Sequence, residues 1–148
     1  MKMNYLELLG SDLKSEPLVD LFERHDVSVV YEYDRKYENR PDRYVAQIPS
    51  LGLEFIFDDQ RKLQELFIKS LGTLAGGPFA CDESLRVFED KGEAEEFARR
   101  NSIEFTEATE DEMGFDICRI RFLRDEYSIE YQFVRSALHM ITIRKGNA

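Results

Sequence analysis

One pattern, a helix followed by four strands, occurs twice along this chain of 148 residues. Apolar residues at helical spacing predict helices from Ser15 to His25 and from Gly92 to Asn101, and alternating apolar residues predict strands after each helix. The second pattern follows the first by about 75 residues, so that Phe22 corresponds to Phe97. Two such segments could also agree by chance. A true repeat predicts two equivalent modules, each with one helix on one face of an antiparallel sheet.

The expected fold class is therefore α+β, with two tandem α-β-β-β-β modules in which a helix covers each antiparallel sheet. The first module spans residues 1–70 and the second spans residues 82–148. Glycine and proline are frequent near the junction at 71–81, where they favour turns. The two sheets are expected to lie side by side or to join edge to edge into one longer sheet, and the chain to form one compact unit.

Two polar segments interrupt the strands, 34–43 in the first module and 107–116 in the second, and both are predicted as loops. The closing strand, 138–143, is expected at a sheet edge, where it would allow a homodimer to form. The predicted strands are 27–31, 44–48, 53–57, 63–68, 103–105, 117–123, 127–133 and 138–143.

The net charge of −10 is concentrated in one part of the chain. Residues 1–81 carry −4, residues 82–116 carry −9 and residues 117–148 carry +3. Charge that is segregated in this way favours a partner of opposite sign, although a merely solvated acidic face is the alternative. The acidity argues against nucleic acid or an anionic membrane as a direct partner, because phosphate contacts need Lys and Arg.

Composition and cysteine content predict a cytoplasmic globular protein. The 43% of hydrophobic residues suffices for a packed core. Cys81 and Cys118 do not make a disulfide framework and are expected to be free thiols in a reducing compartment. No apolar run approaches the roughly 20 residues that span a bilayer. Glu7 interrupts what would be the apolar centre of a signal peptide.

Few residues have the pattern of a catalytic, metal or cofactor site. His25 and His139 are expected to be structural, and neither has a second histidine at metal-ligand spacing. Acids next to Cys81 would raise the pKa of its thiol, and Cys118 alternates with core residues. Asp58 and Asp59 are typical of a turn. The sequence therefore favours a binding protein that is not an enzyme and that uses no cofactor and no metal.

A row of basic residues, Arg119, Arg121 and Arg124, is expected along one strand of the second module. These side chains are interpreted as the solvent side of an amphipathic strand, paired across to Glu130. Phosphate binding is the alternative.

Residues 6–68 resemble small bacterial immunity-like proteins, which are encoded beside polymorphic or contact-dependent-inhibition toxins. The resemblance depends on an Asp-Arg…Glu-Asn-x-Pro-Asp-x-Tyr run at 34–44 and on four shorter motifs. These motifs are Leu8-Leu9-Gly10, Ser15-x-Pro17, Gly52-Leu53-Glu54-Phe55 and Leu66-Phe67-Ile68. The resemblance implies that the chain binds and neutralises one cognate toxin, and it carries no catalytic residues.

Many such toxins are nucleases with basic clefts, which an acidic surface can occupy as a phosphate mimic. The loops at 34–43 and 107–116 would occupy equivalent positions in the two modules and could form one composite surface. The expected partner-binding residues are Glu107, Glu110, Asp111, Glu112, Asp116, Glu38 and Asp42.

The alternative function is that of a small-molecule-binding domain or degenerate enzyme of unknown ligand. Its pocket would lie between sheet and helix and would be lined by aromatic residues. The same side chains could instead be plain core. They are Tyr31, Tyr33, Tyr44, Phe55, Phe57, Tyr131 and Phe133.

Overall fold

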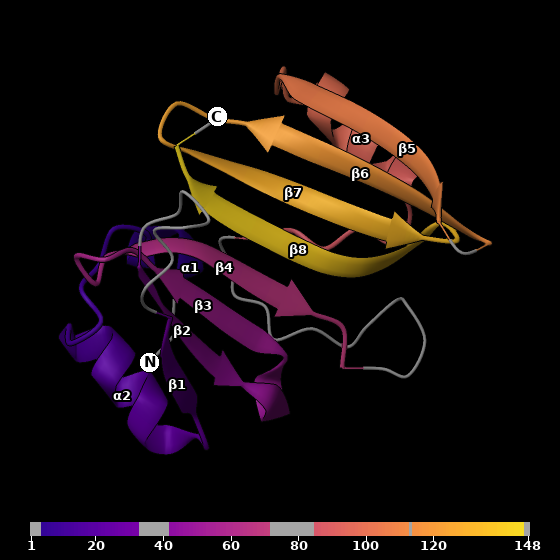
Figure 1. Cartoon of the computed structure of the whole chain (residues 1–148). Helices are drawn as coiled ribbons and strands as arrows, with labels where there is room; N and C mark the ends of the chain where they lie inside the picture. The colour runs from indigo at the N-terminus through magenta and orange to yellow at the C-terminus, as the bar shows by residue number, and fades with distance from the viewer. Residues whose placement is uncertain (1–3, 33–41, 72–84, 113, 147–148) are drawn as a thin grey trace.

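The chain folds into one eight-stranded antiparallel sheet with few helices, and Figure 1 shows how strongly this sheet is twisted. The computed structural model describes residues 4–32, 42–71, 85–112 and 114–146. The strand order is β1-β2-β3-β4-β8-β7-β6-β5, which confirms the α+β class and the edge-to-edge alternative for the sheet. The strands are β1 (Ser28–Glu32), β2 (Arg43–Ile48), β3 (Leu53–Phe57), β4 (Leu63–Lys69), β5 (Phe105–Glu112), β6 (Phe115–Leu123), β7 (Tyr127–Val134) and β8 (Ala137–Lys145).

The closing strand β8 lies in the middle of the sheet, so the prediction that residues 138–143 form an exposed edge is wrong. Strand β8 pairs with β4 on one side and with β7 on the other. This arrangement leaves β1 and β5 as the two ends of the strand order (Figure 1). The predicted junction at 71–81 lies outside the described residues, except for Leu71.

Both predicted helices are present, and a short third helix precedes them. Helix α2 (Glu16–Arg24) begins after Ser15 with a proline in its first turn, where a missing N–H costs nothing. Helix α3 (Lys91–Arg100) is capped by Asp90, whose carboxylate accepts a hydrogen bond from the backbone N–H of Glu93 at 2.9 Å. Helix α1 (Tyr5–Leu8) was not predicted, because four residues are too few to show periodicity.

A short 3₁₀ helix (Pro49–Leu51) connects β2 to β3 where a turn was predicted. It ends at Gly52, whose φ of 67° is rare for residues with a side chain. A Cβ atom at this position would also lie 2.6 Å from the backbone oxygen of Lys69. Glycine is therefore required here both by the backbone conformation and by the close approach of β4.

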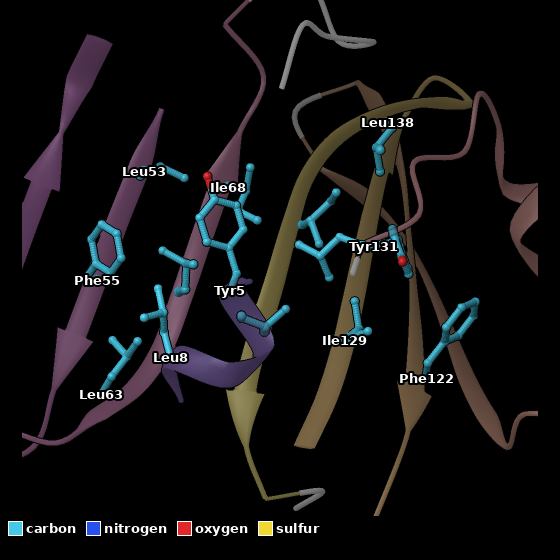
Figure 2. Packing of buried hydrophobic residues seen from close by; sticks show 14 of the residues in the cluster. Tyr5, Leu8, Leu53, Phe55, Leu63, Ile68, Phe122, Ile129, Tyr131 and Leu138 are labelled. Carbon is cyan, nitrogen blue, oxygen red and sulfur yellow. The ribbon is translucent and has the colours of Figure 1, made fainter. Parts of the chain in front are cut away.

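One face of the sheet, called the helix face below, carries the hydrophobic core. Phe22 of α2 contacts Phe55 of β3 edge to face at 5.3 Å between ring centroids, and Phe97 of α3 stacks on Phe122 of β6 at 6.4 Å. Tyr5 and Leu8 of α1 lie between the strands of the two halves, over the junction of β4 and β8 (Figure 2). The three helices thus cover successive parts of the same face.

The opposite face of the sheet carries an ion-pair network that links the two halves. Arg144 of β8 contacts Glu65 of β4 at 2.7 Å and Glu130 of β7 at 3.9 Å. Arg121 lies directly across from Glu130, as the sequence predicts. Arg124 follows the end of β6 at Leu123, so it does not belong to that strand face, contrary to the prediction.

Candidate functional site: an acidic hairpin

The predicted acidic loop at 107–116 is wrong, because most of this segment is a β-hairpin. Strands β5 and β6 pair over eight residue positions, from Phe105 opposite Phe122 to Glu112 opposite Phe115. The turn includes Gly114 at a φ of 81°, a conformation that glycine adopts without strain. The five predicted acids at 107–116 are therefore fixed on a two-stranded ribbon at one end of the sheet (Figure 1).

Strand β5 has no apolar alternation because neither face of its middle part is buried. Every residue from Thr106 to Asp111 is exposed, on both faces of the strand. Alternation, which would have identified the strand, arises only where one face is buried. The available signals were the β-favouring Phe105, Thr106 and Thr109, and the glycine of the turn.

The predicted acids separate onto the two faces of the hairpin. Residues directly opposite in an antiparallel pair share a face, and alternate residues along a strand do so too. Glu107, Asp111 and Asp116 therefore lie on the helix face, while Glu110 lies on the opposite face. Glu112 is the last residue of β5, one position after Asp111.

Two carboxylates face each other at the end of the hairpin. Asp111 and Asp116 form a directly opposed pair in the register, and both side chains are exposed. Like charges at such a pair of positions destabilise a hairpin. A cation that bound between them would relieve this repulsion, so the pair is suited to a positively charged partner.

Glu110 differs from the acids on the helix face because it already has a cation. Its carboxylate forms an ion pair with Arg119 on the adjacent strand β6. Part of its charge is therefore neutralised within the chain. Glu110 is the weaker candidate for binding a partner's cation, although the sequence does not distinguish it from Asp111.

An exposed aromatic residue, which was not predicted from the sequence, lies at the same end of the hairpin as Asp111 and Asp116 but on the opposite face. Phe115, the first residue of β6, is 41% exposed. The guanidinium carbon of Arg135 lies 4.5 Å from the centre of its ring, a cation–π contact that orients the ring. Aromatic residues of this kind often anchor protein interfaces. The sequence signal that could have identified Phe115 is its position directly after the turn glycine, Gly114.

The acids predicted in the first module do not join the hairpin in a composite surface. Asp42 accepts a hydrogen bond from the Tyr31 hydroxyl at 2.8 Å and directly precedes β2. Strand β2 is five strand intervals from β6 in the sheet order, or about 24 Å at the usual spacing. Glu38 lies outside the described residues. The prediction of a composite surface is therefore wrong for Asp42, because the halves join through β4 and β8.

Cys118 of β6 belongs to the hairpin, where it lies opposite Thr109, and it is buried at the edge of the core. Its thiol donates a hydrogen bond to the Glu107 carboxylate, with the sulfur and oxygen 3.4 Å apart. Burial raises the pKa of the Cys118 thiol, and the bond to Glu107 raises it further. Both effects oppose the thiolate that a nucleophile requires. Cys81 lies outside the described residues.

Most of the aromatics proposed for a pocket are core residues. Phe55, Phe57, Tyr131 and Phe133 are at most 1% exposed and belong to the hydrophobic cluster (Figure 2 labels Phe55 and Tyr131). Tyr31 is instead 43% exposed and stacks on Tyr44. Tyr33 lies outside the described residues.

A surface hollow of about 660 Å³ lies elsewhere, where α1 meets the ends of β7 and β8. Lys145 and Glu126 are the charged residues among the described residues of its lining. Within the described part of the chain, no group of three or more His, Cys, Asp or Glu side chains is arranged to hold a metal ion. The described helices are all too short or too polar to cross a bilayer.

No protein-family model matches the chain, and no curated protein or solved structure matches it either.

Proposed function

We propose that this chain is an immunity protein, which binds one cognate bacterial toxin in the cytoplasm and blocks it. The observation that carries the proposal is the acidic hairpin, in which the exposed residues Asp111 and Asp116 oppose each other near the turn. Repulsion within the free hairpin costs stability, and a cationic partner would recover that stability on binding. The resemblance of residues 6–68 to immunity-like proteins supports the same class.

The partner that fits this hairpin is a basic cleft, such as the phosphate-binding groove of a nuclease toxin. Carboxylates on a ribbon can occupy such a groove without offering a bond to cleave. Opposite charges on two proteins can raise the association rate constant to about 10⁸–10⁹ M⁻¹s⁻¹ at low salt. Phe115 is exposed at the same end of the hairpin but on the opposite face, so it would supply an apolar anchor to a cleft that encloses both faces of the ribbon.

In this proposal the chain performs no catalysis of its own and needs no metal or cofactor. Inhibition follows from occupying the toxin's substrate site. Glu107, Asp111 and Asp116 are the primary contacts because they share one face, and Glu110 is secondary because of its ion pair with Arg119.

We also propose that the two halves are repeat modules, with residues 1–70 equivalent to 82–148. The central strand pair supports this. Phe67 pairs with Thr142, the position about 75 residues later, so the repeat exchanges the two members of this pair. Leu66 pairs with Ile143, and Ile68 pairs with Ile141. In the repeat Leu66 is equivalent to Ile141 and Ile68 to Ile143, so the first pair is equivalent to the second. The β4–β8 junction thus has the register of a local twofold axis.

The test of the proposed function uses the gene encoded beside this one. Its product, or the C-terminal part of a large secreted product, should be toxic when expressed alone in a bacterial host. Coexpression of this chain should restore growth, and the purified proteins should form a stable complex in which the toxin's activity is blocked. A neighbouring product that is not toxic, or a toxin that this chain neither binds nor inhibits, would refute the proposal.

A further inference from the structure

The two ends of the sheet are edges of opposite chemical character. Strand β5 carries the acids described above, whereas β1 exposes three large apolar side chains. Val29, Val30 and Tyr31 are 48%, 52% and 43% exposed. Val30 and Ala108 occupy equivalent positions in the two halves of the sheet. Val30 pairs with Val45, which pairs with Ile56. Ala108 pairs with Arg119, which pairs with Gln132, the residue that corresponds to Ile56 in the repeat. Equivalent positions on the two edges thus differ in chemistry.

Charged side chains on an edge strand are a common protection against pairing with another chain. Strand β5 has this protection, and the run Val29-Val30-Tyr31 lacks it. Strand β1 is the end of the strand order, so no described strand occupies its outer side. Val29 and Val30 are β-branched and exposed at this end of the sheet, and such side chains favour the addition of a strand.

We propose that the strand added to β1 is β1 of a second copy of this chain. The sequence of β1 is self-complementary in an antiparallel pair centred on Val30. Each Val29 would then face Tyr31 of the other copy, and the two Val30 side chains would face each other. This symmetry makes the interface isologous, as most homodimer interfaces are.

A hollow beside β1 gives the second copy a further apolar contact. This hollow of about 340 Å³ lies on the face opposite the helices. Val30, Val45, Ile56 and Phe67 contribute to its lining, and Arg43 lies among them. Val45 and Ile56 are each 9% exposed, whereas Val30 at 52% is the most exposed of these four apolar residues. The Val30 side chain of a second β1 would cover it.

Charge favours a second copy at the β1 edge over one at the β5 edge. Two copies each with a net charge of −10 repel, and the repulsion is smallest where the acidic segments are farthest apart. Residues 82–116 carry −9, and their hairpin lies at the end of the sheet remote from β1. Pairing through β1 keeps both hairpins at the outer ends of a sixteen-stranded sheet. The dimer and the proposed function are independent of each other.

The test is the oligomeric state of the full chain, measured by sedimentation velocity over a range of concentrations. A five-residue strand pair buries less than a standard interface, so we expect a dissociation constant between about 1 µM and 1 mM. Val30→Lys should shift the chain to monomer, while Ala108→Lys at the equivalent position of β5 should leave the dimer unchanged. Both sites are exposed, and circular dichroism checks that each variant folds.

A cross-link then identifies the register. In a Cys81→Ser background, Val30→Cys should form a disulfide-linked dimer under mild oxidation, because the two side chains face each other across the twofold axis. Ala108→Cys in the same background should not. A chain that stays monomeric throughout the concentration range would overturn the proposal. So would a dimer that Val30→Lys leaves intact, or one that cross-links through Ala108→Cys.

Discussion

At the scale of single residues, the carboxylates of the β5–β6 hairpin are unequal in environment although they are adjacent in sequence. Asp111 faces Asp116, whereas Glu110 faces away and pairs with Arg119. Glu107 is engaged by the buried thiol of Cys118. Residue type alone could not reveal these differences, because they depend on register. Each environment predicts a different response to substitution.

Asp116→Asn should stabilise the chain. It removes the repulsion with Asp111, so the free energy of unfolding should rise by about 0.2–1 kcal/mol at low salt. Urea denaturation measures the change, and the gain should shrink as salt screens the repulsion. Glu110→Gln is the matched control: it removes an ion pair and should not stabilise. A lower stability for Asp116→Asn would show that the two carboxylates do not repel.

Cys118 should react slowly with thiolate-selective reagents in the native chain. Its raised pKa leaves little thiolate at neutral pH, and Glu107→Gln should speed the reaction because a negative charge beside the sulfur is lost. A Cys81→Ser background makes the measurement specific. Equal rates for both chains would show that the Glu107 carboxylate has no influence on the thiol.

The same shift in pKa predicts how stability depends on pH. A thiol whose pKa is raised in the folded state contributes stability that is fully present below its unfolded pKa of about 8.5. This contribution is lost as the pH rises through the folded pKa. Cys118→Ala should therefore lose less stability between neutral and alkaline pH than the parent chain does. An identical loss in both would show that Cys118 does not titrate differently in the folded state.

At the scale of elements, the sequence predicts those whose side chains form a recognisable pattern over enough residues and misses those that are too polar or too short to show one. Strand β3 alternates Leu53, Phe55 and Phe57 toward the core, so its bounds were predicted correctly. Strand β5 is exposed on both faces in its middle part, and α1 is shorter than a periodicity window. Strand β8 was identified but placed wrongly, because local patterns do not specify which strands become neighbours.

Helix α1 contributes to stability out of proportion to its length. Leu8 is 5% exposed and lies over the junction of the two halves (Figure 2). Leu8→Ala should lower the free energy of unfolding by about 2–5 kcal/mol, as truncation of a buried leucine usually does. Leu6→Ala in the same helix is the control, since Leu6 is only partly buried and should cost less. If both variants lost the same small amount of unfolding free energy, Leu8 would contribute no more to the core than Leu6 does.

At the scale of the whole molecule, the pairing of β4 with β8 determines how far the acidic hairpin lies from the apolar edge strand β1. Joining the halves through their last strands places β1 and β5 at opposite ends of one sheet. The composition predicted an acidic region, but only the strand order separates it from the apolar edge at Val29–Tyr31. In our two proposals, the β5 end of the sheet binds a basic partner and the β1 end binds a second copy of the chain.

Whether the hairpin binds the cognate toxin proposed for this chain is tested most directly by the association rate constant of the two proteins, measured by stopped flow as a function of salt. The variant Asp111→Lys/Asp116→Lys reverses the hairpin charge. The control Asp26→Lys/Asp59→Lys changes the net charge equally on exposed residues of the first half. Steering through the hairpin predicts a rate constant that falls steeply with salt for the parent and the control. The hairpin variant should associate at least about tenfold more slowly at low salt and depend little on salt. Equal rate constants for the hairpin variant and the control, at every salt concentration, would contradict the account.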